Sequence, residues 1–509
     1  MLSSEMAAVL SPLFERWAGV PATSISELGA NGSNRRYFRL WGGDKCCIAA
    51  CNDDVRENDA FVYYSREMRK RGLPVPEVYA VSDDHRCYLQ QDLGDETLYG
   101  HLYAKRQQGG GFDDEMLTLY RQVLSDLADF HTRCRDLDFS YAYPRSDFDR
   151  QSMQWDLQYF KYFFLKLLHV PFDEQLLEDD FNRLIDYLLQ EDCRYFMYRD
   201  FQSRNIMLVR NGEQKAENLQ THDSDSQFSI LNSQLYYIDY QGGRRGAAQY
   251  DVASLLYSAK SDLPEPLRRE LLDHYIRMLS EKIGQMPADS RPAFSADAFR
   301  KRFYGYVLIR IMQALGAYGY RGHVERKSYF LQSVPLALAN LRRVLEDHWP
   351  PVEMPHLRSV LDDIAHRVTA TPPVFPEDRL TVTVMSFSYK KGLPDDDSGN
   401  GGGFVFDCRA LPNPGRYEQY KTLTGRDAAV IQFLEGDEAV ESFLEHAATL
   451  VRQSVTQYNE RHFAHLMVSF GCTGGQHRSV YCAERMAKLL QDDDTCQVRL
   501  IHREQDAKQ

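Results

Sequence analysis

The sequence predicts a two-lobed α+β domain followed by a smaller α/β domain. Strand-like segments fill residues 25–50, helical patterns dominate from about 113 to 370, and strands and helices alternate again after about 380. A chain of 509 residues is too long for one hydrophobic core, so we expect two or three domains. The hydrophobic content of 43% suffices for globular packing.

A small sheet with one inner helix is predicted for the first lobe. Residues 1–19 have the pattern of an amphipathic helix, and a hairpin leads from Ile25 into a third strand that ends near Ala50. Residues 57–71 are expected to be helical, since Gly72 and Pro74 end the pattern. VYAVS and CYLQQDL supply two more strands.

The second lobe is mostly helical, with short strands near 206–209 and 235–239. The polar segment 211–234 separates these strands and is predicted to be a surface insertion, and 106–114 a flexible loop. Three prolines between 372 and 376 predict a linker. We therefore expect one domain over 1–371, a linker over 372–378 and a second domain over 379–509.

The second domain is predicted to alternate strands with helices. The strand segments are LTVTVMSFSY, FVFDCRAL, HLMVSFG and QVRLIHRE, and residues 479–490 form a helix with one apolar face.

Composition excludes several classes of protein. A net charge of −13 argues against a mainly nucleic-acid-binding protein. No apolar run reaches the length of a membrane span, and the first residues lack a signal-peptide pattern. Ten cysteines without an export signal predict free thiols in a reducing compartment, so we expect a cytoplasmic protein.

Three polar residues carry the predicted chemistry. YRDFQSRN at 198–205 contains Asp200 and Asn205, and YYIDYQGG at 236–243 contains Asp239. Phosphoryl transfer from ATP needs a carboxylate that takes the acceptor's proton, and an amide and a second carboxylate that hold magnesium. Protein kinases order them as H-R-D-x-x-x-x-N and D-F-G. Each of these residues alone would fit a solvated carboxylate or a turn asparagine at the surface. Their occurrence together, in this order, favours a catalytic role.

YRDFQSRNIM and IDYQGGRRGAAQYDVASLLY resemble the aminoglycoside phosphotransferase and choline kinase superfamily. GSNRRYFRL at 32–40, the segment at 75–99 and LADFHTRC at 127–134 are similar to its bacterial anomeric sugar kinases, which phosphorylate N-acetylmuramate or N-acetylglucosamine at C1. The resemblance spans about 20–370 and implies a protein-kinase-like fold. It implies Asp200 as base, Asn205 and Asp239 as magnesium ligands, and a nucleotide-phosphate turn of Asn31, Gly32, Ser33 and Asn34 together with Arg35.

The resemblance also implies supporting roles. Asp251 would support the catalytic loop, with a helix-capping role as the alternative, and His131 is interpreted as a core residue. Gln90, Gln91 and Asp92 would lie at the hinge between the lobes. Arg244 and Arg245 would contact phosphate or a substrate carboxylate, or form an exposed basic pair.

Two positions depart from the family pattern. Tyr198 stands where kinases have His, at a scaffold position that we expect to tolerate the change. Kinases also place a lysine on the third strand, but in KCCIAACND the inward positions are Ala and Cys, and Lys45 comes too early. Arg35 or Arg36 could replace it; otherwise the domain is a pseudokinase.

A glycine-rich loop connects a strand to a helix in the second domain. Its amides and glycines at the helix start, with Arg478, predict a phosphate site. The predicted residues are Cys472, Thr473, Gly474, Gly475, Gln476, His477, Arg478 and Ser479. The spacing Cys472-x5-Arg478 also fits cysteine phosphatases, an alternative that lacks an assigned acid.

SFSYKKGLP, FVFDCRALPNP, LTGRD, GCTGGQHRSVYCAERMA and the final HRE resemble the C-terminal domain of the RNase adapter RapZ over about 380–504. The resemblance implies a sugar-phosphate fold that senses glucosamine-6-phosphate. Gly415 stands where a His can face the sugar phosphate. The basic tail is reduced to EQDAKQ, so RNA binding is not expected.

We therefore predict an ATP- and magnesium-dependent small-molecule kinase. Its acceptor would be the anomeric hydroxyl of an amino sugar, and its C-terminal domain would bind a sugar phosphate. The alternative is a sensor or adapter of glucosamine-6-phosphate-like metabolites with a weak or inactive kinase lobe, and a bifunctional kinase–phosphatase ranks third. The acceptor, the domain coupling and a homo-oligomeric state stay open.

Overall fold

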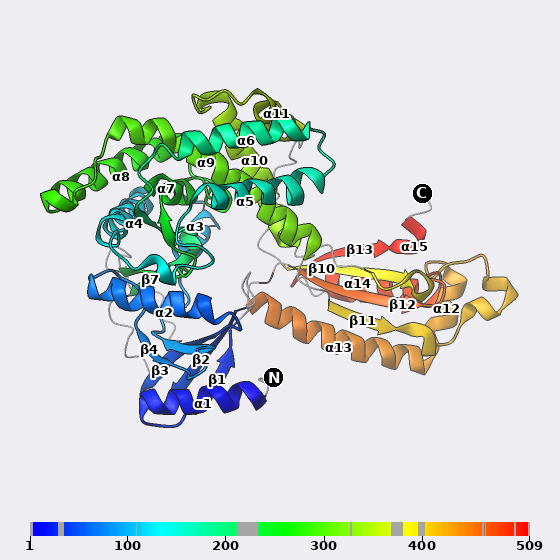
Figure 1. The fold of residues 1–509 in the computed structure, drawn as a ribbon. Helices are drawn as coiled ribbons and strands as arrows, with labels where there is room; N and C mark the ends of the chain where they lie inside the picture. The colour runs from blue at the N-terminus through cyan, green and yellow to red at the C-terminus, as the bar shows by residue number, and fades with distance from the viewer. Residues whose placement is uncertain are drawn as a thin grey trace. The chain divides into compact units, whose positions relative to one another are not determined.

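The chain folds into two compact units (Figure 1): residues 1–317 with 336–369, and 318–335 with 370–509. The computed structural model describes residues 4–28, 35–107, 109–210, 233–325, 328–367, 380–394, 403–460, 463, 465–492 and 495–506. Three predicted segments lie outside these ranges in whole or for the most part: the phosphate turn Asn31–Asn34, the insertion 211–234 and the linker 372–378.

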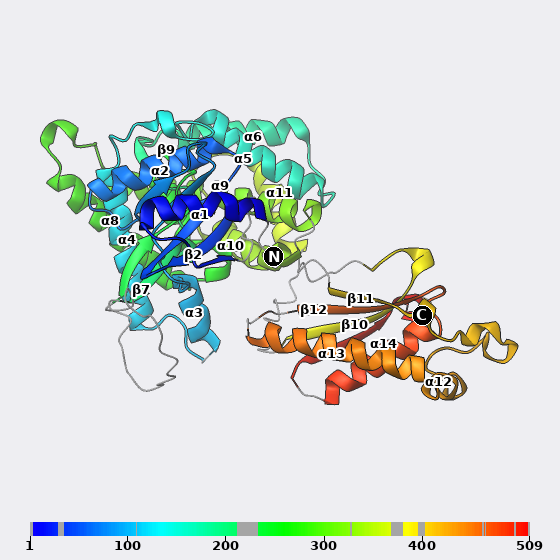
Figure 2. The same ribbon diagram turned by 90° about the horizontal axis from the view of Figure 1, so that it is seen from below.

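A five-stranded antiparallel sheet forms the first lobe, in the order β1-β2-β3-β5-β4. The strands are β1 (Ser24–Glu27), β2 (Arg36–Gly42), β3 (Lys45–Cys51), β4 (Val78–Val81) and β5 (Cys87–Gln90). Helix α1 (Ser4–Ala18) covers one face, where Phe14 packs in a core with Phe38 and Leu89 (Figure 2). The other face carries Tyr88, whose ring stacks on Phe61 of α2 (Val55–Lys70).

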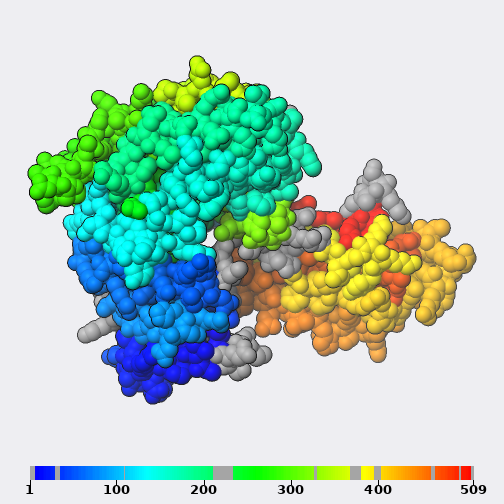
Figure 3. All heavy atoms as spheres, viewed as in Figure 1, coloured from blue at the N-terminus to red at the C-terminus, as the bar shows by residue number. Residues whose placement is uncertain are grey.

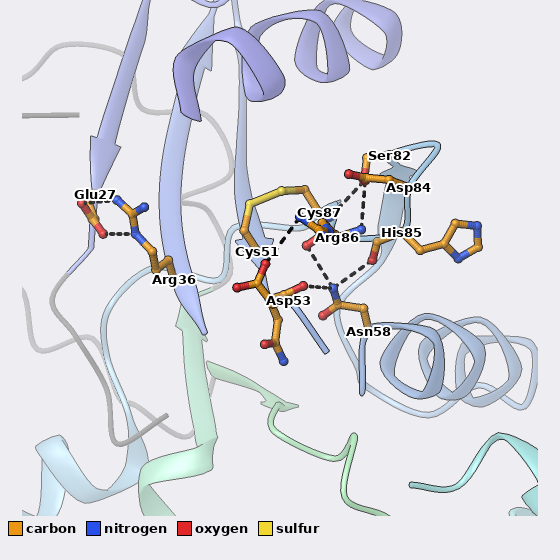
Figure 4. Close-up of a disulfide and its surroundings, with 11 residues drawn as sticks. Glu27, Arg36, Cys51, Asp53, Asn58, Ser82, Asp84, His85, Arg86 and Cys87 are labelled. Atoms are coloured by element: carbon orange, nitrogen blue, oxygen red, sulfur yellow. Dashed lines mark hydrogen bonds and ion pairs between the residues drawn. A yellow bond between two sulfur atoms is a disulfide. The ribbon is translucent and has the colours of Figure 1, made fainter. Parts of the chain in front are cut away.

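A disulfide joins Cys51 at the end of β3 to Cys87 at the start of β5 (Figure 4). The two residues are direct register partners in the sheet. The expectation of free thiols throughout is wrong for this pair, because only strand pairing brings together two cysteines 36 positions apart. Free thiols are found at Cys46, Cys47, Cys134, Cys193, Cys408, Cys472 and Cys482.

Helices dominate the second lobe of the first unit, as predicted. They are α3 (Leu98–Gln107), α4 (Asp114–Arg133), α5 (Arg150–Phe160), α6 (Glu174–Leu188), α7 (Ala248–Leu256), α8 (Glu265–Gln285), α9 (Ala296–Gly319), α10 (Val334–Asp347) and α11 (Pro355–Arg367). Asp113, Asp149 and Asp173 cap the first turns of α4, α5 and α6 by accepting backbone N–H groups.

Two short antiparallel pairs sit among these helices. Strand β6 (Tyr195–Met197) pairs with β9 (Arg244–Gly246), and β7 (Ile206–Arg210) pairs with β8 (Ser233–Tyr237). The segment 198–205 therefore connects β6 to β7, and Asp239 lies two residues after the end of β8. The loop 198–205 runs from β6 to β7, and the loop that carries Asp239 runs from β8 to β9. Because β6 pairs with β9 and β7 with β8, the two loops lie side by side.

Hydrogen bonds join the two lobes of the first unit, which meet directly in the space-filling view (Figure 3). Tyr64 of α2 donates to the carbonyl of Gly243 at 3.0 Å, and the Ser65 hydroxyl lies 2.5 Å from the Tyr240 hydroxyl. Helix α2 is thereby attached to the loop that follows Asp239.

The second unit contains a four-stranded parallel sheet in the order β11-β12-β10-β13. Its strands are β10 (Thr381–Ser388), β11 (Gly403–Asp407), β12 (His465–Cys472) and β13 (Gln497–His502). Its helices are α12 (Ala428–Glu435), α13 (Glu438–Glu460), α14 (Arg478–Asp492) and α15 (Arg503–Asp506), and α14 contains the predicted helix 479–490. Nearly every residue of β10 and β12 is buried, as is typical of parallel strands.

In the part of the chain that the structure describes, no helix has both the length and the apolar content needed to cross a membrane.

Candidate phosphotransfer site

One side-chain amide brings the three predicted residues together. Asn205 Nδ2 donates to the backbone carbonyl of Asp200 at 2.9 Å and to Oδ2 of Asp239 at 3.1 Å. Asn205 ends a short 3-10 turn, Ser203–Asn205, just before β7. The loop and the strand end therefore present one amide and two carboxylates to the same place.

Asp251 of α7 fixes the catalytic loop from inside the core. It is fully buried, and its two oxygens accept the backbone N–H groups of Tyr198 at 2.7 Å and Arg199 at 2.8 Å. His131, also fully buried, places Nε2 at 2.9 Å from the same carboxylate and Nδ1 at 2.5 Å from the Tyr275 hydroxyl. These bonds support the loop rather than cap a helix.

Two residues with an unusual backbone conformation lie at the site. Arg199 has a φ of +77° and Asp239 a φ of +71°, a region that non-glycine residues rarely adopt. The bonds from Asp251 to the Arg199 N–H and from Asn205 to Asp239 hold both residues there. Such strain persists only where the surrounding contacts enforce it, and it is common at functional sites.

Tyr198 ties the catalytic loop to the strand end that carries Asp239. Its buried hydroxyl donates to the carbonyl of Ile238, and its ring packs edge-on against Phe130 and Tyr240. A scaffold made of one hydrogen bond and ring packing explains how tyrosine replaces the usual histidine here.

The electrostatics at Asp239 favour a cation. Burial raises the pKa of its carboxyl and the nearby charge of Asp200 raises it further, while the amide of Gln241, donating at 2.7 Å, and the charge of Arg35 oppose both. A divalent cation would relieve the repulsion between the two carboxylates, and carboxylate and amide oxygens are the ligands that magnesium prefers.

The side chains at the site supply too few ligands to hold a metal ion without a nucleotide. Within the described ranges, no group of three or more His, Cys, Asp or Glu side chains is placed to hold a metal by itself. One carboxylate and one amide fit a magnesium ion that takes its remaining ligands from phosphates and water.

Sequence reasoning missed Arg310, which lies on α9, 110 positions after Asp200. Its Nη2 is 3.4 Å from Oδ1 of Asp200, and its Nε donates to the Ser254 hydroxyl at 3.1 Å. Its Nη1 donates to Gln313. No motif surrounds Arg310, so only the packing of α9 against the catalytic loop could identify it.

The predicted nucleotide side is described only at Arg35, because the other four positions are outside the described residues. Arg35 is buried, with Nη2 at 3.1 Å from Oε2 of Glu57. Asp92, expected at the hinge, binds Arg39 through Nε at 2.7 Å, and Gln91 donates its backbone N–H to the carbonyl of Glu77.

The two arginines after Asp239 differ. Arg244 is buried, its Nε donates to the carbonyl of Gly242, and burial lowers the pKa of its guanidinium to about 10. Arg245 is more exposed and pairs with Asp147 at 2.8 Å. An exposed basic pair is therefore the wrong interpretation.

The glycine-rich loop of the second unit surrounds the Cys472 sulfur with donors. Gly475 donates its N–H to Sγ at 3.2 Å, and the Ser479 hydroxyl lies 3.1 Å away. Burial raises the pKa of the thiol, but the Ser479 hydroxyl and the N–H groups of Ser479, Gln476 and Gly474 outweigh it, so the net shift is downward. Thr473 and Gly474 are exposed.

The other side chains of this loop bind backbone carbonyls of the same unit. Gln476 donates to the carbonyls of Lys421 and Leu423. The ring of His477 lies 2.8 Å from the carbonyl of Tyr420, and Arg478 Nη1 donates to the carbonyls of Arg409 and Leu411. These three side chains fix the segment 409–423 to the loop, and the loop's role as a sugar-phosphate site stays a prediction.

Two family models match this chain in separate parts. Residues 24–216 match the phosphotransferase enzyme family, and residues 380–506 match the RapZ C-terminal domain. Two separate parts of the chain are thus similar to a phosphotransferase domain and to a RapZ C-terminal domain. Both resemblances drawn from the motifs are thereby confirmed, as is the predicted fold class of a kinase-like α+β domain followed by a smaller α/β domain.

Individual proteins are similar to parts of the chain. A nucleotide-binding protein of Xanthomonas axonopodis pv. citri is 36% identical over 143 residues, which is 28% of this chain and 49% of that protein. A nucleotide-binding protein of Dinoroseobacter shibae is 45% identical over 112 residues, 22% of this chain and 36% of that one. The chain thus spans about half, or less, of these relatives.

Among solved structures, an ethanolamine kinase of Plasmodium vivax has a TM-score of 0.44 and 10% identity, covering 63% of this chain and 83% of its own. A choline kinase of Cryptosporidium parvum has a TM-score of 0.43 and 12% identity, covering 71% of this chain and 99% of its own.

Proposed function

We propose that the phosphotransferase domain transfers the γ-phosphoryl group of ATP to an alcohol hydroxyl of a small molecule, with magnesium as cofactor. The observation that carries this proposal is the Asn205 amide, which bonds both to the loop of Asp200 and to the carboxylate of Asp239. This is the arrangement that in-line phosphoryl transfer needs, because a base and a metal site must face one phosphate.

Each residue has a distinct task in this proposal. Asp200 accepts the proton of the attacking hydroxyl, and Arg310 positions its carboxylate. Asn205 and Asp239 would hold magnesium, which supplies charge neutralisation on the phosphate oxygens when bound. Asp251 keeps the backbone of the catalytic loop in its strained conformation, so the base does not reorganise during the reaction.

The proposed acceptor is an amino sugar at its anomeric hydroxyl. The similarity of GSNRRYFRL and the segment 75–99 to anomeric sugar kinases supports this choice. The RapZ C-terminal domain also supports a sugar acceptor, because a domain that binds sugar phosphates could bind the product of a sugar kinase. A kinase of this kind would work in the cytoplasm, where ATP is supplied.

A panel of acceptors tests this proposal. The full chain is incubated with ATP, magnesium and either N-acetylated sugars, free amino sugars, choline or ethanolamine, and ADP release is measured. We expect turnover with an N-acetylated sugar and a product whose phosphate blocks the reducing end. Turnover with only choline or ethanolamine would refute the proposed sugar acceptor but would still support kinase activity.

The RapZ C-terminal domain is proposed to bind a sugar phosphate at the loop 472–479. Thr473 and Gly474 are exposed residues that precede α14, a helix of 15 residues whose N-terminus favours an anion. Calorimetric titration of the full chain with glucosamine-6-phosphate, and with inorganic phosphate as control, measures this binding.

The alternative is a sensor whose kinase lobe is inactive. It is favoured by one observation: Ala50, not lysine, occupies the strand position opposite Tyr37 and Tyr88. Thermal stabilisation by glucosamine-6-phosphate without any stabilisation by magnesium and ADP would select this alternative.

A further inference from the structure

Strand β3 has no lysine on the face of the sheet that packs against α2. Ala50 is cross-strand partner to both Tyr37 and Tyr88, so the three side chains share one face. Tyr88 stacks on Phe61 of α2, which in turn stacks on Tyr240, the residue after Asp239. This face therefore borders the candidate site, and a small alanine occupies the position where a cation is needed.

Lys45, at the start of the strand, lies elsewhere. Its Nζ donates to the carbonyl of Ala18 at 3.0 Å and lies 5.4 Å from the ring centroid of Trp17, both of them on α1. Since α1 covers the opposite face of the sheet, Lys45 belongs to the structural core of that face.

Arg35 lies on the face of the sheet that carries Ala50. It precedes β2 and is two residues from Tyr37, and alternate residues of an extended chain share a face. Its side chain is 2% exposed, and Nη2 lies 3.1 Å from Oε2 of Glu57 in the first turn of α2. Glu57 is itself oriented, because it accepts the amide of Asn52 at 2.9 Å.

The charge of Arg35 acts on the predicted magnesium ligand. It is one of the groups that oppose the upward pKa shift that burial imposes on Asp239. Burial raises the pKa of the half-buried Tyr37, Arg35 lowers it, and Asp239 raises it as well. The guanidinium and the carboxylate therefore face the same small region from the two lobes of one unit.

Arg36 is on the other side of the sheet. Its Nε and Nη2 donate to the two oxygens of Glu27 at 2.8 and 3.0 Å, an exposed pair at the sheet edge (Figure 4). Of the two arginines that could replace the lysine, only Arg35 lies on the face of the sheet that carries Ala50.

We propose that Arg35, positioned by Glu57, binds the phosphates of the nucleotide in place of the third-strand lysine. This inference rests on the proposed kinase function. A lysine on the third strand paired with a glutamate of the neighbouring helix has this role in protein kinases. Here the cation comes from the residue just before the adjacent strand β2, two residues before Tyr37, the partner of Ala50. A guanidinium offers two parallel N–H donors, which fit two phosphate oxygens.

Calorimetric titration of the full chain with ADP and magnesium tests the proposal. We expect Arg35→Met to weaken binding about ten- to hundredfold, the loss of one charge-assisted contact. Arg36→Met, which removes the same chemistry from the opposite face, serves as the matched control and should bind as the wild type does. Adding Ala50→Lys to Arg35→Met should restore most of the affinity, because the new ammonium would come from the face of the sheet that carries Tyr37 and Tyr88.

The outcomes separate this inference from the proposed function. If Arg35→Met binds ADP and magnesium as tightly as the wild type, the role of Arg35 is refuted and the kinase stands. A folded double variant that binds no better than Arg35→Met would also refute the lysine-like role. If the wild type itself binds no ADP, both proposals fail.

Folding is checked by the thermal unfolding of each variant. Should Arg35→Met not fold, Arg35→Lys and Glu57→Gln provide the same measurement. Arg35→Lys keeps the charge but loses the two parallel N–H donors, so it should bind more weakly than the wild type and more tightly than a variant without the charge. Glu57→Gln releases the guanidinium and should bind more weakly, and unchanged affinity in Glu57→Gln would refute its positioning role.

Discussion

Asn205 Nδ2 donates to Oδ2 of Asp239 at 3.1 Å, although 34 positions separate the two residues. The bond joins the end of the catalytic loop to the residue that follows β8. It fixes the two predicted magnesium ligands relative to each other before any ion arrives, so little reorganisation is needed on binding.

Asp200→Asn should abolish turnover while leaving the protein folded and able to bind nucleotide. The amide is isosteric but takes no proton, so we expect kcat to fall about 10²- to 10⁴-fold. Steady-state kinetics with ATP and an N-acetylated sugar measure it, and Asp297→Asn, at a fully exposed carboxylate of α9, is the control. Turnover retained in Asp200→Asn would remove this residue from the role of base.

Asp239→Asn should inactivate the enzyme and yet stabilise the ligand-free protein at neutral pH. Burial raises the pKa of Asp239 in the folded state, so between the unfolded value of about 4 and the folded value the native protein holds a proton that the unfolded chain has lost. Stability from this group therefore falls as pH rises through that window, and the neutral amide avoids the loss.

Melting temperatures from pH 4 to pH 8 measure this effect. The variant should melt above the wild type at pH 8, and the difference should shrink toward pH 4. Magnesium and ADP should raise the Tm of the wild type and not that of the variant. A variant that melts below the wild type at pH 8 would contradict the electrostatic account.

Arg310→Met should lower kcat and leave the KM for ATP unchanged. The guanidinium contacts Asp200 and no predicted nucleotide ligand, and a partly exposed pair of this kind contributes about 1 kcal/mol, or roughly fivefold in rate. Arg310→Lys should recover part of the loss. Arg300→Met, at an exposed ion pair of the same helix, is the control; equal effects on kcat and KM would indicate a general structural role instead.

Gly475→Ala should destabilise the RapZ C-terminal domain, whereas Gly474→Ala should not. Gly475 has a φ of +66°, and an added Cβ would lie 2.4 Å from Cγ of Glu504, while Gly474 has open space around it. We expect the free energy of unfolding to fall by about 1–3 kcal/mol for Gly475→Ala. Denaturant unfolding of the full chain measures both variants. Equal free energies of unfolding for the two variants would contradict the prediction and show that the loop shifts to accommodate the added Cβ.

Local pattern was enough to predict the two architectures and the loops that carry Asp200, Asn205 and Asp239. The motif residues are close in sequence to the strands that place them, so strand and turn signals locate them. Arg310 and the Cys51–Cys87 disulfide could not be predicted, because each depends on packing between segments far apart in the chain.

Two questions about arginine side chains could be answered only from the structure. The sequence alone does not distinguish Arg35 from Arg36. The structure directs Arg35 toward Glu57 of α2 and Arg36 toward Glu27 of β1. Likewise, the spacing around Arg478 suggested a phosphate ligand, but its Nη1 is used on the carbonyls of Arg409 and Leu411, a contact that no motif encodes.

The disulfide between Cys51 and Cys87 closes a covalent ring around the segment that contains all of α2. Glu57 lies inside this ring, near one of its ends. An outward swing of α2 would therefore have to carry the adjoining edges of β3 and β5 with it. The helix that carries the partner of Arg35 thus lies within a covalently closed segment, whose two ends are paired residues of β3 and β5.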